Sequence, residues 1–415
     1  MKNLLVLSLL GCCALMDTST GLSRDSIYIN DSESNCNNSD DRDGANSDNP
    51  NQKDNINENR SDTITLSYGY FEGGYSNNQL ARFGLELLRA GSRIERYFAQ
   101  KNPEHSQLIK CASWVINLLI QQGFWTAYHE TGHGLAVKAY GADYQLLSKS
   151  DDNSPFEKDE NFFKFFTKSI FRSSRAACRY RITSDKLAQF STDERAKAQI
   201  RFSAGGMNNE MRFAELLTEE LYEKGNLTDI ESFVYFAQRL LPAFYAADKK
   251  GTGDPEIDKA SSDDPVAIGA LWELRGISAR RSDIGNAGLI SMLLSGTTYS
   301  IFYNIYTSNK HGTPYSATPL RFHRFRIPDT FAYISPRGMT YKFVSSYQIH
   351  PEFEILFGYE TVVKGQSANE FNLGVRKVFS SLGNTAVKVV TTFGEGFNGE
   401  ASIGVPLANR VLFEV

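Results

Sequence analysis

The sequence predicts an α+β fold in which helices come first and antiparallel strands follow. Apolar residues recur at helical spacing up to about residue 318. After about Leu320 they alternate with polar residues, which is typical of half-buried strands. The 415 residues are enough for two or three domains. We therefore expect a mainly helical domain over 63–318 and an antiparallel β domain, a sheet or a barrel, over 319–415.

The first residues predict export from the cytoplasm. Residues 1–20 read as a signal peptide, with Lys2, an apolar run and then small residues. Leu9-Leu10-Gly11-Cys12 resembles a bacterial lipobox, in which Cys12 becomes the lipidated first residue; ordinary cleavage near Ala14 is the alternative. Residues 21–62 are rich in Asn, Asp and Ser and predict a disordered linker. We expect a location in the cell envelope, periplasmic or at the outer membrane.

Composition argues against two classes of protein. The formal net charge of −4 is small and no basic stripe is present, so we expect no nucleic-acid partner. Two of the five cysteines belong to the leader, which leaves an odd number and argues against a full disulfide framework.

Several elements follow from local patterns. Residues 63–71 predict a strand and 78–99 a helix. The uncharged stretch 111–128 is either a buried helix or, at the lower limit of length, a membrane span, and 284–309 leaves the same two readings open. Further helices are expected over 228–241 and 265–280, and a Gly- and Asp-rich stretch over 249–264 reads as a loop.

The C-terminal part predicts six to eight antiparallel strands joined by short turns, such as the one at 364–367. One face of these strands is aromatic and aliphatic, and the other is polar. This pattern fits an outer-membrane barrel with an apolar exterior, and equally a sandwich or small barrel with an apolar interior. The hairpins, the terminal Phe413 and the leader favour the outer-membrane barrel.

The sequence His129-Glu130-Thr131-Gly132-His133 is an H-E-x-x-H motif. On a helix, residues four apart share a face, so His129 and His133 can present two imidazoles to one metal ion. Glu130 lies between them, where a carboxylate can take a proton from water. The motif predicts a Zn²⁺ site with Glu130 as general base.

Residues 126–135 resemble the metal-binding helix of the zincin metallopeptidases, and the run on to Ala142 also resembles that of the site-2 proteases. The resemblance implies peptide hydrolysis, with zinc bound by His129 and His133. Two family features are absent. The Asn-x-x-Pro…Asp-Gly segment of site-2 proteases is not found, and Ala139 stands where metzincins have a third histidine.

A third zinc ligand is expected from a separate helix. Glu210 follows Gly205-Gly206, which permit close backbone approach, and we expect it at the start of a helix. It lies 210 − 133 = 77 residues beyond the second histidine. Asn209 and Glu215 are the substitutes for this role.

Three functions follow from these patterns. The first is a zinc metallopeptidase of the cell envelope that acts on a peptide or protein substrate, with a membrane close by. The second is an outer-membrane structural or transport barrel in which the H-E-x-x-H is incidental. The third is a site-2-like intramembrane protease, which requires residues 111–128 to cross a membrane.

Overall fold

The computed structural model describes residues 64–67, 77–102, 105–148, 155, 157–159, 161–171, 176–181, 189–248, 251–311, 315–350, 352–379, 385–394, 397–404, 406–408 and 411–414. Contacts divide the chain into two compact units. Among the described residues, the first unit contains 91–206 and 251–271, and the second contains 64–90, 207–250 and 272–414. The predicted signal peptide with Cys12, and the linker over 21–62, lie outside the described residues.

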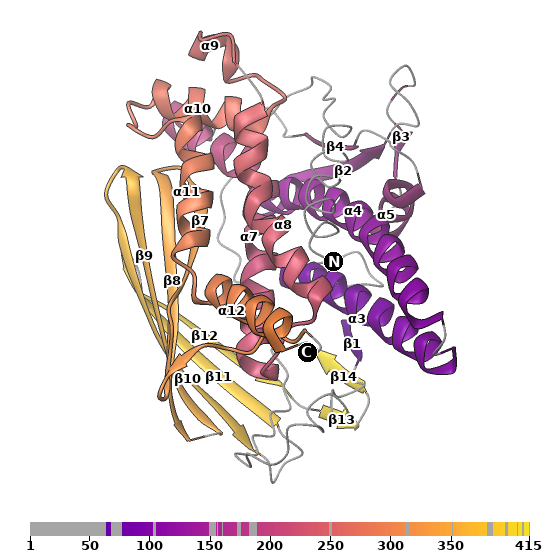
Figure 1. Ribbon diagram of the computed structural model, residues 1–415. Helices are drawn as coiled ribbons and strands as arrows, with labels where there is room; N and C mark the ends of the chain where they lie inside the picture. The colour runs from indigo at the N-terminus through magenta and orange to yellow at the C-terminus, as the bar shows by residue number, and fades with distance from the viewer. Residues whose placement is uncertain are drawn as a thin grey trace. The chain divides into compact units, whose positions relative to one another are not determined.

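Helices dominate the chain before residue 312 (Figure 1). They are α3 (Asn77–Lys101), α4 (Ser106–Lys138), α5 (Phe162–Phe171), α7 (Thr192–Lys224), α8 (Asp229–Asp248), α9 (Pro255–Asp258), α10 (Asp264–Leu274), α11 (Arg281–Leu293) and α12 (Gly296–His311). The predicted stretch 111–128 lies inside α4, which continues without a break through the H-E-x-x-H motif. The stretch 284–309 is divided between α11 and α12. In the part of the chain that the structure describes, no helix is both long and apolar enough to cross a membrane.

In the first unit, α4 packs against α5 and a small antiparallel sheet. The sheet contains β2 (Asp143–Ser148), β3 (Glu157–Lys158) and β4 (Ala176–Arg181) in the order β3-β2-β4. Gly123 and Gly134 allow the close packing, because a Cβ atom on either would overlap Ile170 or Tyr144. The sheet therefore lies directly on the helix that carries the motif.

The second unit is built around an antiparallel sheet of eight strands. They are β5 (Arg321–Phe322), β6 (Phe325–Arg326), β7 (Asp329–Ser335), β8 (Gly338–His350), β9 (Phe353–Gly365), β10 (Asn369–Phe379), β11 (Thr385–Phe393) and β12 (Phe397–Gly404). A separate sheet joins β1 (Ile64–Ser67), β14 (Val411–Glu414) and β13 (Pro406–Ala408). The α+β class is thus confirmed, with helices followed by antiparallel strands.

The larger sheet is open. Its path runs β12-β11-β10-β9-β8-β6-β5, with β7 on the same side of β8 as β6, and among the described strands its two ends do not pair with each other. The barrel form of the predicted β domain is therefore not formed by these strands. The turn predicted at 364–367 is present between β9 and β10, where Gly365 has a φ of 134° that favours glycine.

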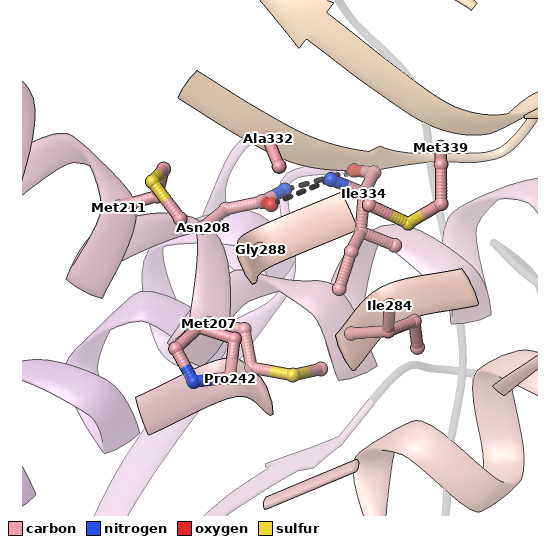
Figure 2. A pocket seen from close by; sticks show the side chains of 9 residues that line it. All are labelled: Met207, Asn208, Met211, Pro242, Ile284, Gly288, Ala332, Ile334 and Met339. Atoms are coloured by element: carbon pink, nitrogen blue, oxygen red, sulfur yellow. Dashed lines mark hydrogen bonds between the residues drawn. The ribbon is translucent and has the colours of Figure 1, made fainter. Parts of the chain in front are cut away.

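Helices of the second unit cover the edge of β7. The side-chain amide of Asn208 accepts from the backbone N–H of Ile334 and donates to its carbonyl, both at 2.9 Å (Figure 2). This bond pair replaces a neighbouring strand at that edge. Two further donors, the Trp272 indole and the Arg275 guanidinium, bind the carbonyls of Ser335 and Pro336.

A buried carboxylate joins α7 to the sheet. Glu215 is 3% exposed and lies 2.9 Å from Lys342 Nζ and 3.1 Å from Arg212 Nη1, and it accepts a hydrogen bond from Tyr333. Burial alone would raise the pKa of this carboxyl, but the two cations and the hydrogen bond more than offset it and hold the pKa well below its usual range. The charged form of Glu215 is therefore the stabilising one.

This cluster predicts a pH-dependent stability. A group whose pKa is lower in the folded state stabilises above its unfolded pKa, near 4.3, and loses that contribution as pH falls toward the folded value. Glu215→Gln should cost about 3 kcal/mol at pH 7, because it removes the carboxylate closest to both Lys342 and Arg212 from a buried position. The difference between the two proteins should shrink below about pH 4. Urea unfolding of both at pH 7 and pH 3.5 measures it; a difference that does not change with pH would contradict the assignment.

The helix expected to begin near Glu210 begins instead at Thr192, because Ser191 and Glu194 form a capping box. The two units are not consecutive in the chain, so the domain boundary at 318/319 stays a prediction.

Candidate metal centre

The H-E-x-x-H motif is helical, as predicted, and places both imidazoles on one face of α4. The rings of His129 and His133 have centroids 4.9 Å apart. A third group faces them from the start of α10: Asp264 Oδ2 is 3.5 Å from His129 Nε2 and 3.3 Å from His133 Nε2. Potential ligand atoms of all three residues lie within 4.8 Å of one another, and among the described residues this is the one group of its kind.

The electrostatics of the group follow from burial and mutual contact. Burial lowers the pKa of His133, but the adjacent Asp264 carboxylate raises it by more than burial lowers it. The pKa of His133 is therefore above its usual value. Burial raises the pKa of Asp264, and the two imidazoles outweigh this effect and bring it below the usual value. Without a metal ion, the Asp264 carboxylate and the protonated His133 imidazole therefore stabilise one another.

The backbone of α7 orients one of the two imidazoles. His133 Nδ1 lies 2.6 Å from the carbonyl oxygen of Phe202, to which it donates as an N–H. Because Nδ1 carries this proton, Nε2 is the nitrogen that can give its lone pair to a metal ion once its own proton is lost. Phe202 itself is held in an apolar cluster with Val137 and Tyr140 at the end of α4.

Two glycines of α7 make room for the motif. A Cβ atom on Gly205 would lie 2.5 Å from the carbonyl oxygen of Gly132, and one on Gly206 would lie 2.4 Å from His129 Nε2. Such contacts are far inside van der Waals distance, so both positions require glycine while the helices keep this spacing. The close backbone approach expected at Gly205-Gly206 is present, and the element that these glycines approach is α4, the helix that carries the motif.

Glu130 lies beside the small sheet. Its carboxylate accepts a hydrogen bond from the backbone N–H of Cys178 in β4. Burial raises the pKa of Glu130, and the neighbouring imidazoles offset only part of that shift. A carboxylate with a raised pKa is a stronger base, which suits the role predicted for Glu130.

A short folded loop supports Asp264. Asp258 accepts hydrogen bonds from the backbone of Thr252 and Gly253, and Asp254 caps α9. Gln199 of α7 donates to the carbonyl of Lys259 at 2.9 Å. These bonds fix the path of the loop up to the start of α10, where Asp264 lies. Helix α7 therefore contacts both this loop and His133.

The sequence did not predict Asp264. It stands among five acidic residues between 254 and 264, and nothing in their spacing distinguishes it. The predicted ligand Glu210 is buried within α7, is part of the second unit, and is not a member of the group of three. Of its substitutes, Asn209 is buried in α7, and Glu215 is bound by Lys342 and Arg212.

The second unit also contains a small pocket, which has a different character (Figure 2). Met207, Met211, Ile284, Ile334 and Met339 are among the side chains that line it. None of its lining residues titrates, so it offers no acid, base or strong metal ligand for hydrolysis.

The donor set of the group fits zinc. Two imidazoles and one carboxylate are a known ligand set of catalytic zinc sites, which keep a further position open. Comparisons of the chain with protein-family models, with curated proteins and with solved structures find no match.

The spacing at Gly206 predicts a selective defect. Gly206→Ala should displace the His129 ring and weaken binding of Zn²⁺ or Co²⁺ by roughly 10–100-fold, as loss of ligand orientation does. Because a side chain can move more easily than a backbone, the fold should persist. Isothermal titration and circular dichroism measure the two effects.

Gly285→Ala is the matched control, since a Cβ atom there has its first neighbour at 3.4 Å, an ordinary contact. Unchanged metal affinity in Gly206→Ala would show that the ring of His129 is not constrained by α7.

Proposed function

We propose that the protein is a zinc-dependent peptide hydrolase, with the metal ion held by His129, His133 and Asp264 and with Glu130 as general base. The observation that carries the proposal is the convergence of the three ligand side chains. The leader predicted over 1–20 supports a location in the cell envelope.

The distances between Asp264 and the two imidazoles suit ligands that would share one metal ion. Bonds of about 2.0–2.1 Å from zinc to nitrogen or oxygen put neighbouring ligand atoms roughly 3.3 Å apart in a tetrahedron. The two separations between imidazole Nε2 and Asp264 Oδ2 are 3.3 and 3.5 Å. The same groups could therefore receive zinc with little rearrangement.

The residues around the group define the chemistry. A zinc ion there supplies Lewis acidity, which acidifies water and polarises a carbonyl group. Glu130 takes a proton from the attacking water and returns it to the leaving nitrogen, so its carboxylate must be ionised at the start of each turnover. The N–H of Cys178 fixes that carboxylate, and the carbonyl of Phe202 fixes His133.

The edge of β4 supports a peptide as the substrate. In a strand, backbone N–H groups alternate between the two sides, and that of Cys178 points to Glu130 and thus away from β2. Leu146, which stands opposite Cys178 in β2, supports this direction. Its carbonyl accepts a hydrogen bond from the backbone N–H of Asp159 on the far side of β2, so Leu146 and Cys178 do not hydrogen-bond each other. Ala176, two residues earlier in β4, directs its backbone groups to the same side as Cys178. An extended peptide laid along this edge passes beside the general base.

Zinc content and turnover test the assignment of ligands and base. We expect about one zinc per chain in the unchanged protein and in Glu130→Gln, and loss of zinc in His133→Ala and Asp264→Asn. Cleavage of an unfolded protein such as casein should fall by at least about 100-fold in Glu130→Gln, because only the base is lost. Elemental analysis of the full chain and a peptide-release assay provide the readouts.

Asp263→Asn is the matched control, because it makes the same change one residue away and should keep the metal. Glu210→Ala tests the earlier prediction for that residue and should also retain zinc. Loss of zinc in Glu210→Ala together with its retention in Asp264→Asn would overturn the proposed ligand set.

The proposed substrate position predicts a proline effect. Ala176→Pro removes an N–H on the side of Glu130 at the first position of β4, where a sheet tolerates proline. KM should rise roughly 5–10-fold, the effect of about 1 kcal/mol from one hydrogen bond, with zinc content unchanged. Ala177→Pro instead removes an N–H on the side of β2 and should lower the melting temperature. Equal KM values for Ala176→Pro and the unchanged protein would exclude pairing along this edge.

A further inference from the structure

Charged and apolar side chains lie on opposite faces of β9, β10 and β11. The register pairs Phe371 with Tyr359 and Phe393, and Val375 with Ile355 and Val389. Since alternate residues share a face, one side of these three strands forms an apolar face. It comprises Ile355, Phe357, Tyr359, Phe371, Leu373, Val375, Val387, Val389 and Phe393. Its one charged residue within the same register rows is Lys377, at one end.

The opposite face carries the charges. Glu354 and Glu360 of β9, Arg376 of β10 and Lys388 of β11 all have the other parity. Glu354 is 6% exposed and lies 3.2 Å from Arg376 Nη2 and 3.5 Å from Arg321 Nη1. Ser346 also donates a hydrogen bond to Glu354. These ionic groups are thus paired and partly withdrawn from solvent.

The apolar face, by contrast, is open to solvent. Leu373 and Val375 are each 41% exposed, Phe371 is 43% exposed and Phe393 is 47% exposed. A sheet that has one face in water normally turns its charged side outward and its apolar side to a core. In this sheet the charged side is partly buried and the apolar side is in water. A second apolar body that packs on this face would remove the apolar side chains from solvent.

We propose that this body is a second copy of the chain, so that two sheets pack face to face in a dimer. Tyr347 of β8 pairs with Ile355 and is also exposed on this side, and the exposed apolar surface amounts to several hundred Å². Such a surface is at least as large as the roughly 300–600 Å² of the largest patch on a typical monomer, and it is on the order of the roughly 800 Å² that each partner of a stable complex buries.

The open sheet favours a protein partner over lipid hydrocarbon. Among the described strands, β12 and β5 are the ends of the sheet and leave edge N–H and C=O groups. Hydrocarbon cannot satisfy such groups, at a cost of several kcal/mol each, so open sheet edges are not found there. Against another sheet, only the face is covered and the edges keep their access to water.

The distribution of residues on the apolar face suits a two-fold axis. Aromatic rings form the row of Tyr359, Phe371 and Phe393, and aliphatic side chains form the row of Ile355, Val375 and Val389. The row that contains Phe357 and Leu373 lies between them. An axis across the strands at this middle row places the aromatic row of one copy on the aliphatic row of the other, which makes the surface self-complementary.

The mass of the full chain in solution tests the proposal. Sedimentation equilibrium at micromolar concentration should give twice the 46.5 kDa of one chain. Leu373→Glu should raise the dissociation constant of the dimer by at least about 100-fold and make the protein monomeric, because it buries an unpaired charge at the centre of the interface. Leu293→Glu in α11 is the matched control, since this leucine is 56% exposed and lies outside the sheet. It should remain dimeric.

Two outcomes would overturn the dimer. One is an unchanged protein that stays monomeric at high micromolar concentration. The other is a dimer that persists in Leu373→Glu while circular dichroism shows an unchanged fold. Flotation with phosphatidylcholine vesicles separates the lipid alternative: binding of the unchanged monomer that Leu373→Glu abolishes would assign the face to lipid instead. None of these readouts depends on zinc.

Discussion

The close approach of α7 to α4 is the constraint on which the candidate metal centre depends. Gly205 and Gly206 let the helix backbones come together where Gly132 and His129 lie. At that distance the carbonyl of Phe202 reaches His133, and Gln199 reaches the loop that ends at Asp264. Helix α7 thus orients the His133 imidazole and also holds the loop that leads to the Asp264 carboxylate. Any side chain at the crossing would disturb several contacts at once.

Short-range patterns predicted much of this arrangement. The H-E-x-x-H motif predicted a helix with two imidazoles on one face, and the pair of glycines predicted close backbone approach. Both properties are local, because a helix repeats every 3.6 residues and glycine lacks a Cβ atom. Asp264 could not be predicted in this way. It lies 264 − 133 = 131 residues beyond His133, and its proximity comes from the folded path of the intervening chain.

The sheet shows a second limit of sequence patterns. Alternation along β9 to β11 correctly separates an apolar face from a polar one, but alternation is symmetric with respect to inside and outside. Only the folded chain shows that Glu354 is buried among its cationic partners while Leu373 is exposed. The start of α7 was also encoded locally, since Ser191 and Glu194 form a capping box that the apolar periodicity alone does not reveal.

The position of Cys178 has a consequence for the redox chemistry of the chain. Burial and the nearby carboxylates of Glu130 and Asp264 raise the pKa of its thiol well above the usual value. Because the thiolate is the form that reacts with oxidants and alkylating agents, this cysteine is protected even though it lies next to the candidate centre. Of the two cysteines that the structure describes, Cys111 is the exposed one. Of these two cysteines, Cys111 is therefore the one at which an oxidising compartment would form sulfenic acid or a mixed disulfide, far along α4 from the histidines.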